Sequence, residues 1–243
     1  GGWYDMLLHD TLAMFTGVRE RGFSEATRES QRLIIGPWVH GPMEPDESLQ
    51  GDFDFGSEAA LGINEFRKRW FDHYLNDEQN GANGMPRVRL FVMGPNKWRD
   101  FDAWPPEGAI ETKMYLGENS VSLDAPTDES SGTSFDYDPS EPVPGLMGGK
   151  LGSRHVGPID MREVEDRKTN FTSEPFDQSI TVIGPVSFNL WASSNAKDTD
   201  WYVTFTDVHP DGSSIRVCEG SLRARYRNGF DREDFMEPGK PYE

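Results

Sequence analysis

The segment LIIGPWVH, residues 33–40, joins a short apolar run to a glycine, a proline, a tryptophan and a histidine. Residues 33–35 form a continuous apolar run that stops at Gly36-Pro37. Such a run is typical of a strand buried on both faces, as parallel strands are. The segment therefore predicts a buried strand of an α/β sheet, with His40 in the loop at its carboxyl end.

Helical patterns lie on both sides of this strand. After Asp5, the apolar residues Leu8, Leu12 and Phe15 recur at helical spacing, and Arg21-Gly22 closes the pattern. After the strand, Ser57-Glu58 opens a second helix, in which the apolar residues form one stripe: Ile63, Phe66, Trp70 and Tyr74. Residues 1–105 are therefore expected to be α/β.

From about Pro105 the sequence changes to long polar stretches and short alternating runs. Residues 186–191, 202–208, 215–218 and 222–226 are expected to be strands, with a tight turn at Asp211-Gly212. This pattern favours an all-β sandwich over residues 106–243, of the jelly-roll type. Both ends look cut, because a sheet needs more strands than the first 105 residues supply.

Charge and cysteine usage exclude several classes of protein. Forty-two acidic and 24 basic residues give a net charge of -18, which disfavours nucleic-acid and anionic-membrane partners. No run of apolar residues is long enough to span a membrane. The single cysteine, Cys218, excludes an internal disulfide framework and a multi-cysteine zinc site, but it does not fix the compartment.

Asp5 and His40 are the candidate catalytic pair. Each is expected just beyond the carboxyl end of a strand, and they lie 35 residues apart, an interval that fits one helix and one strand. In α/β-hydrolases the triad runs Ser, acid, His along the chain. The imidazole takes the serine proton, and the carboxylate fixes its tautomer. On spacing alone, a turn aspartate and a loop histidine remain the alternative.

Longer motifs surround the candidate pair, GGWYD at 1–5 and IGPWVH at 35–40. These two segments resemble those that carry the triad Asp and His in the cocaine-esterase and X-Pro dipeptidyl-peptidase family of serine α/β-hydrolases. Further similar segments follow in the family's order: FGSEAA at 55–60, WFDHYL at 70–75, VRLFVMG at 88–94, DTDW at 198–201, DVHPDG at 207–212 and RARYR at 223–227. The resemblance covers essentially the whole chain.

This resemblance implies the carboxyl-terminal end of an α/β-hydrolase domain, followed by a jelly-roll (galactose-binding-like) domain. It implies that the nucleophilic serine and the oxyanion hole lie upstream of Gly1. It also implies Asp5 and His40 as catalytic residues, with Trp3, Tyr4 and Trp38 as candidates to line the substrate pocket. No cofactor and no metal site are expected.

One departure from the family narrows the expected substrates. The α-amino-acid ester hydrolases of this group carry carboxylates two and three residues after the triad Asp, where this sequence has Leu7 and Leu8. An apolar pair cannot neutralise a substrate ammonium group. The expected partners are therefore small esters, amides or X-Pro peptides.

Other polar residues are weaker candidates. Ser24 lies in a segment that faintly resembles a nucleophile elbow, but a helix cap or a loop is the favoured interpretation. His9 is expected to be a packed or solvated helix residue, and Asp52 and Asp54 a solvated loop rather than a calcium site. The arginines at 223, 225 and 227 favour ion pairs with acidic neighbours.

Two rival hypotheses stand beside the hydrolase. The chain could be a non-catalytic binding module, since jelly rolls often bind carbohydrate, attached to a degenerate hydrolase. As a fragment without its nucleophile, it should have no hydrolase activity by itself. The sequence leaves open the substrate, the compartment (the cytoplasm is slightly favoured) and the oligomeric state, a homo-oligomer included.

Overall fold

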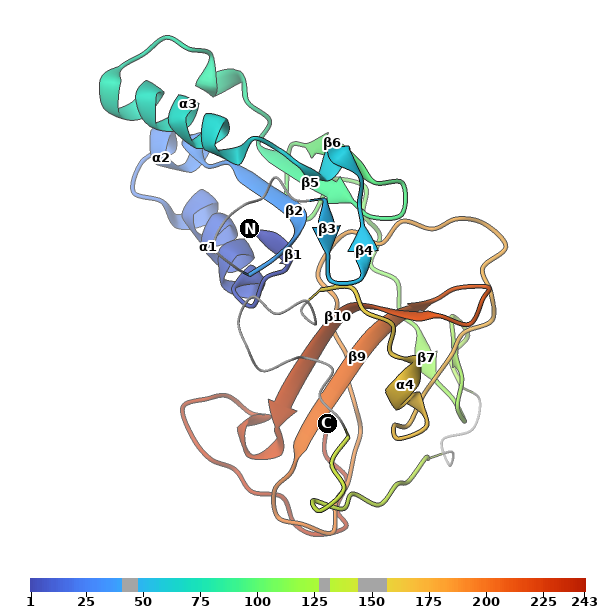
Figure 1. Cartoon of the computed structure of the whole chain (residues 1–243). Coiled ribbons are helices and arrows are strands. Elements are labelled where there is room, and N and C mark those ends of the chain that lie inside the picture. Colours follow the sequence, from blue (N-terminus) through green and yellow to red (C-terminus); the bar gives the residue numbers. More distant parts are fainter. Residues whose placement is uncertain (41–47, 127–131, 144–156) are drawn as a thin grey trace. The chain divides into compact units, whose positions relative to one another are not determined.

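The computed structural model describes residues 1–40, 48–126, 132–143 and 157–243 (Figure 1). Contacts divide the chain into two units, Gly1–Gly184 and Pro185–Glu243. This division does not coincide with the boundary expected between residues 105 and 106. A contact unit can contain parts of two domains, so that boundary stays a prediction.

The first unit is built on a four-stranded sheet in the order β1-β2-β5-β6. Its strands are β1 (Gly2–Tyr4), β2 (Leu33–Val39), β5 (Val88–Val92) and β6 (Lys97–Phe101). β1 pairs with β2 and β2 with β5 in parallel, and β6 closes the sheet as an antiparallel edge. Parallel neighbours joined by helices define an α/β arrangement, as the sequence predicts for this region.

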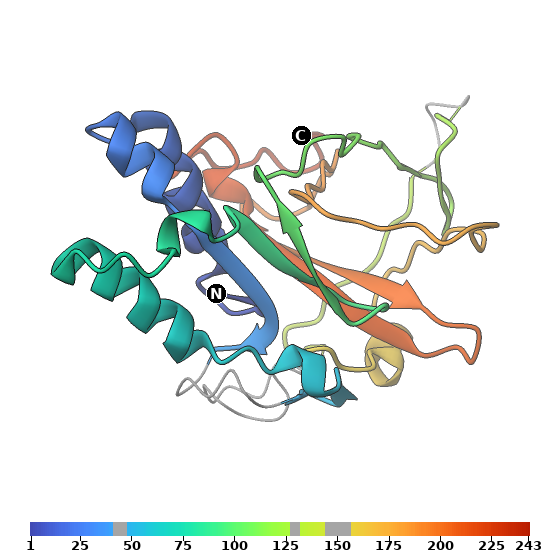
Figure 2. The same ribbon diagram turned by 90° about the horizontal axis from the view of Figure 1, so that it is seen from above.

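Two helical crossovers connect the parallel strands. α1 (Leu8–Arg21) and the short α2 (Glu25–Ser30) join β1 to β2, and α3 (Ile63–Asn76) lies between β2 and β5. In Figure 2 β2 runs between α1 and α3. The predicted first helix is confirmed, and it ends at Gly22. The second begins later than expected, because Ser57–Ala59 forms a separate 3-10 turn.

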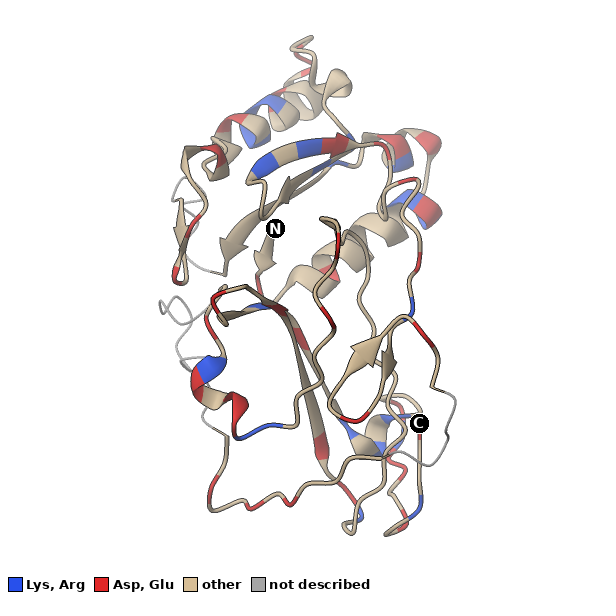
Figure 3. Cartoon of the chain, turned by 90° about the vertical axis from the view of Figure 1, so that its right-hand side faces the viewer, with Lys and Arg blue, Asp and Glu red and all other residues tan. Residues whose placement is uncertain are grey.

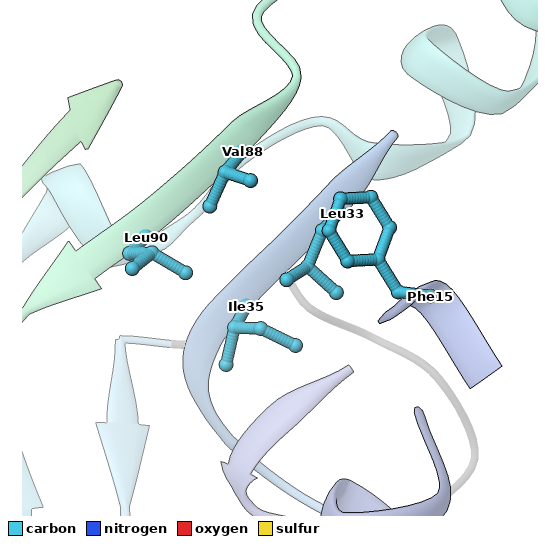
Figure 4. Close-up of a cluster of buried hydrophobic side chains, with 5 residues drawn as sticks. All are labelled: Phe15, Leu33, Ile35, Val88 and Leu90. Atoms are coloured by element: carbon cyan, nitrogen blue, oxygen red, sulfur yellow. The ribbon is translucent and has the colours of Figure 1, made fainter. Parts of the chain in front are cut away.

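The core of the sheet comes from the apolar run and the α1 stripe that the sequence singled out. Leu33 and Ile35 of β2, Val88 and Leu90 of β5, and Phe15 of α1 form one buried cluster (Figure 4). Leu8, Leu12 and Trp3 pack around this cluster. Burying a side chain of this size stabilises the fold by about 1.5–3 kcal/mol, so this cluster fixes α1 against the sheet.

β2 is longer than the sequence indicated. The expectation that it stops at Gly36-Pro37 is wrong, because the strand continues to Val39. β2 pairs with β5 only from Leu33 to Ile35, and its pairing with β1 is irregular between Gly36 and Val39. A proline lacks an N–H for the ladder but is tolerated at an irregularity. Pro37 therefore lies within the strand, and His40 comes directly after its end.

Gly36 is required by a close approach inside this strand. A Cβ at Gly36 would lie 2.4 Å from the indole ring of Trp38. Gly36→Ala is therefore expected to lower the free energy of unfolding by about 1–3 kcal/mol, the usual cost of overpacking. Chemical denaturation of the chain measures this. Gly220→Ala is the matched control, since a Cβ there meets nothing within 4 Å. Equal stabilities of the two variants would contradict the prediction.

The remaining elements of the first unit are short. β3 (Leu49–Gln50) and β4 (Phe53–Asp54) form a small hairpin, and β7 (Tyr115–Leu116) pairs with β8 (Val121–Ser122). A 3-10 turn covers Ala82–Gly84. α4 (Arg162–Glu165) contributes Val164 to a small buried cluster with Ile159 and Met161.

The second unit contains one antiparallel pair, β9 (Asp200–Val208) and β10 (Ser214–Arg223), followed by a 3-10 turn at Ala224–Tyr226. The predicted strands at 202–208 and 215–218 are confirmed, but the strand expected at 222–226 is wrong beyond Arg223, where β10 ends and the 3-10 turn begins. The strand expected at residues 186–191 is wrong, and Val186, Phe188 and Trp191 are exposed. An alternating pattern forms a strand only beside a partner that completes the ladder. The jelly-roll arrangement stays a prediction.

The arginines of this unit form ion pairs, as expected. Arg223 makes two hydrogen bonds to Asp200, and Arg225 pairs with Asp198 and Glu233. Arg227 pairs with Asp234. Figure 3 shows acidic residues distributed along most segments, so carboxylate partners are plentiful. Ion pairs within this unit therefore account for the three arginines.

Candidate active site

The sheet brings Asp5 and His40 together. Asp5 follows Tyr4, the last residue of β1, and His40 follows Val39, the last residue of β2. Tyr4 and Val39 are register partners in the parallel ladder, so the two residues leave the sheet side by side. The Nδ1 atom of His40 lies 2.8 Å from Oδ1 of Asp5. Carboxyl ends of neighbouring parallel strands are where α/β sheets hold ligands.

Local hydrogen bonds fix the Asp5 carboxylate. Oδ1 accepts the backbone N–H of Leu7 at 2.8 Å, and the Asp5 carbonyl accepts the N–H of Leu8 at 2.9 Å. These bonds place the carboxylate at the amino-terminal end of α1, where exposed N–H groups and the helix dipole favour a negative charge. The Asp5 side chain is 21 % exposed. It is therefore oriented before any substrate arrives.

The hydrogen bond to Asp5 also assigns the tautomer of His40. An ionised carboxylate can only accept, so Nδ1 must carry the proton and Nε2 holds the lone pair when the ring is neutral. Among residues 1–40, 48–126, 132–143 and 157–243, no group is hydrogen-bonded to Nε2. The His40 side chain is 31 % exposed. The Nε2 atom of His40 can therefore accept a proton from a further group, one that is not among the contacts described here.

Trp3, Tyr4 and Trp38 are neighbours of this pair along β1 and β2, and the contacts described for them here are with the core. The indole N–H of Trp3 donates to the Phe91 carbonyl at 2.8 Å, and that of Trp38 donates to the Ala59 carbonyl at 3.2 Å. Trp38 is only 8 % exposed, and Tyr4 packs against the cluster that contains Phe91. These contacts attach the ends of β1 and β2 to the core. Their role in lining a substrate pocket stays a prediction.

The other polar candidates lie elsewhere. Ser24 caps α2, because its Oγ accepts the N–H of Thr27 at 3.1 Å, which confirms the preferred interpretation. His9 is exposed on α1, and His73 bonds the Glu78 carbonyl after the end of α3. In the part of the chain that the structure describes, no group of three or more His, Cys, Asp or Glu could hold a metal ion.

Sequence reasoning missed Gln50. It is a buried polar residue, 5 % exposed, and its Oε1 accepts the backbone N–H of Val39 at 3.1 Å. This bond is made one residue before His40. Gln50 lies in a polar segment ten residues after His40, and nothing in that segment marks it as buried.

Before any relative is considered, the fold and the pair define a class of protein: a parallel sheet with helical crossovers, followed by further β-strands, that places an Asp–His pair at the ends of adjacent parallel strands. Its residues 80–243 match the model of the X-Pro dipeptidyl-peptidase C-terminal non-catalytic domain, about two thirds of the chain. The chain therefore belongs to this family. The match begins at residue 80, so Asp5 and His40 both lie before it.

The chain is also similar to several known proteins, and the solved structures among them show a likeness of fold. Cocaine esterase of Rhodococcus sp. (strain MB1 Bresler) is 34 % identical over 258 residues, covering 100 % of this chain and 43 % of that protein. An α-amino acid ester hydrolase structure has a TM-score of 0.75 at 24 % identity, covering 99 % of this chain and 43 % of that one. A CocE/NonD family hydrolase from Staphylococcus aureus has a TM-score of 0.56 at 15 % identity, covering 100 % and 41 %.

These relatives place the chain within the carboxyl-terminal part of a larger protein type. The chain spans less than half of the length of each of these three proteins. It is related to the serine hydrolases, and the part that the family model covers is described as non-catalytic. No described helix is both long and apolar enough to cross a membrane.

Proposed function

We propose that Asp5 and His40 are the acid and the base of a serine-hydrolase triad whose nucleophilic serine belongs to a part of the protein outside these 243 residues. The observation that carries this proposal is the 2.8 Å contact between Asp5 Oδ1 and His40 Nδ1 at the ends of adjacent parallel strands. The likeness to a cocaine esterase supports it, since a serine esterase needs this pair of groups.

The geometry fits a two-step acyl transfer. Nε2 of His40 removes the proton from the serine Oγ as Oγ attacks the carbonyl carbon, and the imidazolium then protonates the departing alcohol or amine. A water molecule then attacks the acyl-enzyme in the same way, with His40 again as the base, and releases the carboxylic acid and the free serine. Asp5 keeps the proton on Nδ1 and stabilises the imidazolium, which it can do because the Leu7 N–H already fixes its position.

The two parts of the chain would belong to different domains. Residues 1–105 would be the end of the α/β-hydrolase domain, and residues 106–243 a jelly-roll β-sandwich of the X-Pro dipeptidyl-peptidase C-terminal type. The parallel strands β1, β2 and β5 with their crossovers support the first part. The family match to a non-catalytic domain and the β9–β10 pair support the second.

The substrate would be a small ester, an amide or an X-Pro peptide. Leu7 and Leu8 argue against a substrate with a free ammonium group beside Asp5. Leu7 is 49 % exposed, and Leu8 packs against the α1 core cluster. Neither side chain can pair with a cation, so an uncharged or anionic acyl group suits this surface better.

Ester hydrolysis by the 243-residue chain alone tests where the nucleophile lies. We expect the purified chain to hydrolyse p-nitrophenyl acetate no faster than its own His40→Ala variant, whereas the intact protein turns the ester over. Only the intact protein would have the serine that the base serves. A burst of p-nitrophenolate stoichiometric with the short chain would contradict the proposal, because it would place a nucleophile within residues 1–243.

A second function applies to the β-rich part alone. Residues 106–243 could bind a carbohydrate or another ligand without catalysis, and the description of the matching family as non-catalytic favours this possibility. A glycan array probed with the whole chain distinguishes the two. Specific glycan binding together with an intact protein that has no esterase activity would favour the binding module over the hydrolase.

A further inference from the structure

Gln50 connects a separate hairpin to the strand that carries His40. β3 and β4 pair through Leu49 with Asp54 and Gln50 with Phe53, which leaves a two-residue turn at Gly51-Asp52. Gly51 has a φ of 59°, as a tight hairpin turn requires. The side chain of Gln50 is buried and its Oε1 accepts the Val39 N–H.

The bond from the Val39 N–H to Gln50 lies beyond the point where the β2–β5 ladder ends. β2 pairs with β5 only as far as Ile35, so Val39 lies beyond the reach of that neighbour. Gln50 supplies the acceptor that a strand would otherwise give. A buried N–H without a partner is costly, and restoring one fixes the backbone to which it belongs. The Trp38–Val39 peptide, one peptide unit before the one that joins Val39 to His40, is therefore held by a side chain.

The hairpin is itself held by a segment distant in sequence. Asp52 N donates to the carbonyl of Pro158 at 3.2 Å, and Pro158 is fully buried. A Cβ added at Gly157 would lie 3.1 Å from the Gly51 nitrogen and 3.2 Å from Cγ1 of Val39. Gly157 thus packs against both the hairpin turn and the last residue of β2.

We propose that Gln50 is a positioning residue for His40, and that Gly157-Pro158 fixes the hairpin that presents Gln50. The inference rests on the proposed function of His40 as the base. Gly157 and Pro158 lie inside the region that matches the non-catalytic domain. That region therefore contributes to catalysis through packing, by fixing the backbone on which the base is mounted, without touching the substrate.

The first test needs no activity. In the 243-residue chain, NMR detects the His40 Nδ1 proton bonded to Asp5 as a far-downfield signal. We expect Gln50→Met, which keeps the length of the side chain but removes the acceptor, to broaden or abolish this signal. Gln50→Glu restores an acceptor and should retain it. The control, Gln79→Met, changes an exposed glutamine and should leave the signal unchanged.

The second test uses the intact protein. Gln50→Met should lower kcat about 10- to 100-fold, as small misplacements of a catalytic group do, with KM within about twofold. Gly157→Ala, and the milder Pro158→Ala, should lower kcat in the same way. Gly132→Ala is the control, because a Cβ there meets nothing within 4 Å.

The outcomes separate the inference from the function on which it rests. Full activity of Gln50→Met together with an inactive His40→Ala would overturn the inference and leave the function standing. Full activity of His40→Ala would overturn the function. An unchanged Nδ1 signal in Gln50→Met would also overturn the inference, because the backbone would then hold His40 without Gln50.

Discussion

Replacing His40 by alanine in the intact protein is expected to lower kcat by about 10⁴- to 10⁶-fold, the range found when the base of a serine triad is removed. The reason is that Nε2 is the acceptor for the serine proton, and alanine offers none. The change should leave the fold intact, since the ring is 31 % exposed and its hydrogen bond is with the Asp5 side chain, at the edge of the sheet. Steady-state ester hydrolysis measures the effect, with circular dichroism to confirm folding.

His9→Ala is the matched control for this variant. His9 lies on α1, one turn after Asp5, and it is exposed. Its replacement should change kcat by less than about twofold, because surface changes away from a site are close to neutral. Near-normal turnover in the His40 variant would exclude His40 as the base. An equal loss in both variants would point to general damage around α1 rather than to the chemistry.

Replacing Asp5 by asparagine is expected to lower kcat by about 10⁴-fold, the effect of the same change in other triads. The asparagine oxygen can still accept the Leu7 N–H, so the turn before α1 is preserved. Because His40 Nδ1 contacts this same Oδ1 atom, the asparagine either keeps its oxygen there, as a neutral group that does not stabilise the imidazolium, or turns its NH2 group toward Nδ1 and forces the imidazole proton onto Nε2. The measurement is kcat for the intact protein on a p-nitrophenyl ester.

Asp10→Asn provides the charge-matched control. Asp10 is an exposed acidic residue in the first turn of α1, so the net charge and the helix dipole change in a similar way. Full activity of Asp10→Asn alongside a strong loss in Asp5→Asn is the expected pattern. If Asp5→Asn retained more than about a tenth of the activity, Asp5 would not be the residue that orients the base.

The sequence was a good guide where position along the chain fixes position in space. Asp5 and His40 each follow a strand end, and parallel strands bring such ends together, so their contact could be predicted from chain order. The α1 stripe likewise predicted its buried face, because helical spacing alone selects Leu8, Leu12 and Phe15.

Contacts that depend on three-dimensional packing could not be predicted. Gln50 is buried only because the hairpin folds back onto Val39, and Gly157 meets both from more than 100 residues away. The indole of Trp38 bonds the Ala59 carbonyl and lies close to Gly36, where a Cβ would meet the ring. Residues 186–191 alternate as a strand does, but none of the described strands pairs with them.

The most direct measurement is the site of fluorophosphonate labelling in the intact protein, read by mass spectrometry of its peptides. The account predicts a single labelled serine outside residues 1–243, with a labelling rate that falls at least 100-fold in His40→Ala and is unchanged in His9→Ala. Labelling of Ser24 or of any other serine within the chain, or a rate that does not depend on His40, would contradict the claim that Asp5 and His40 serve a nucleophile located outside it.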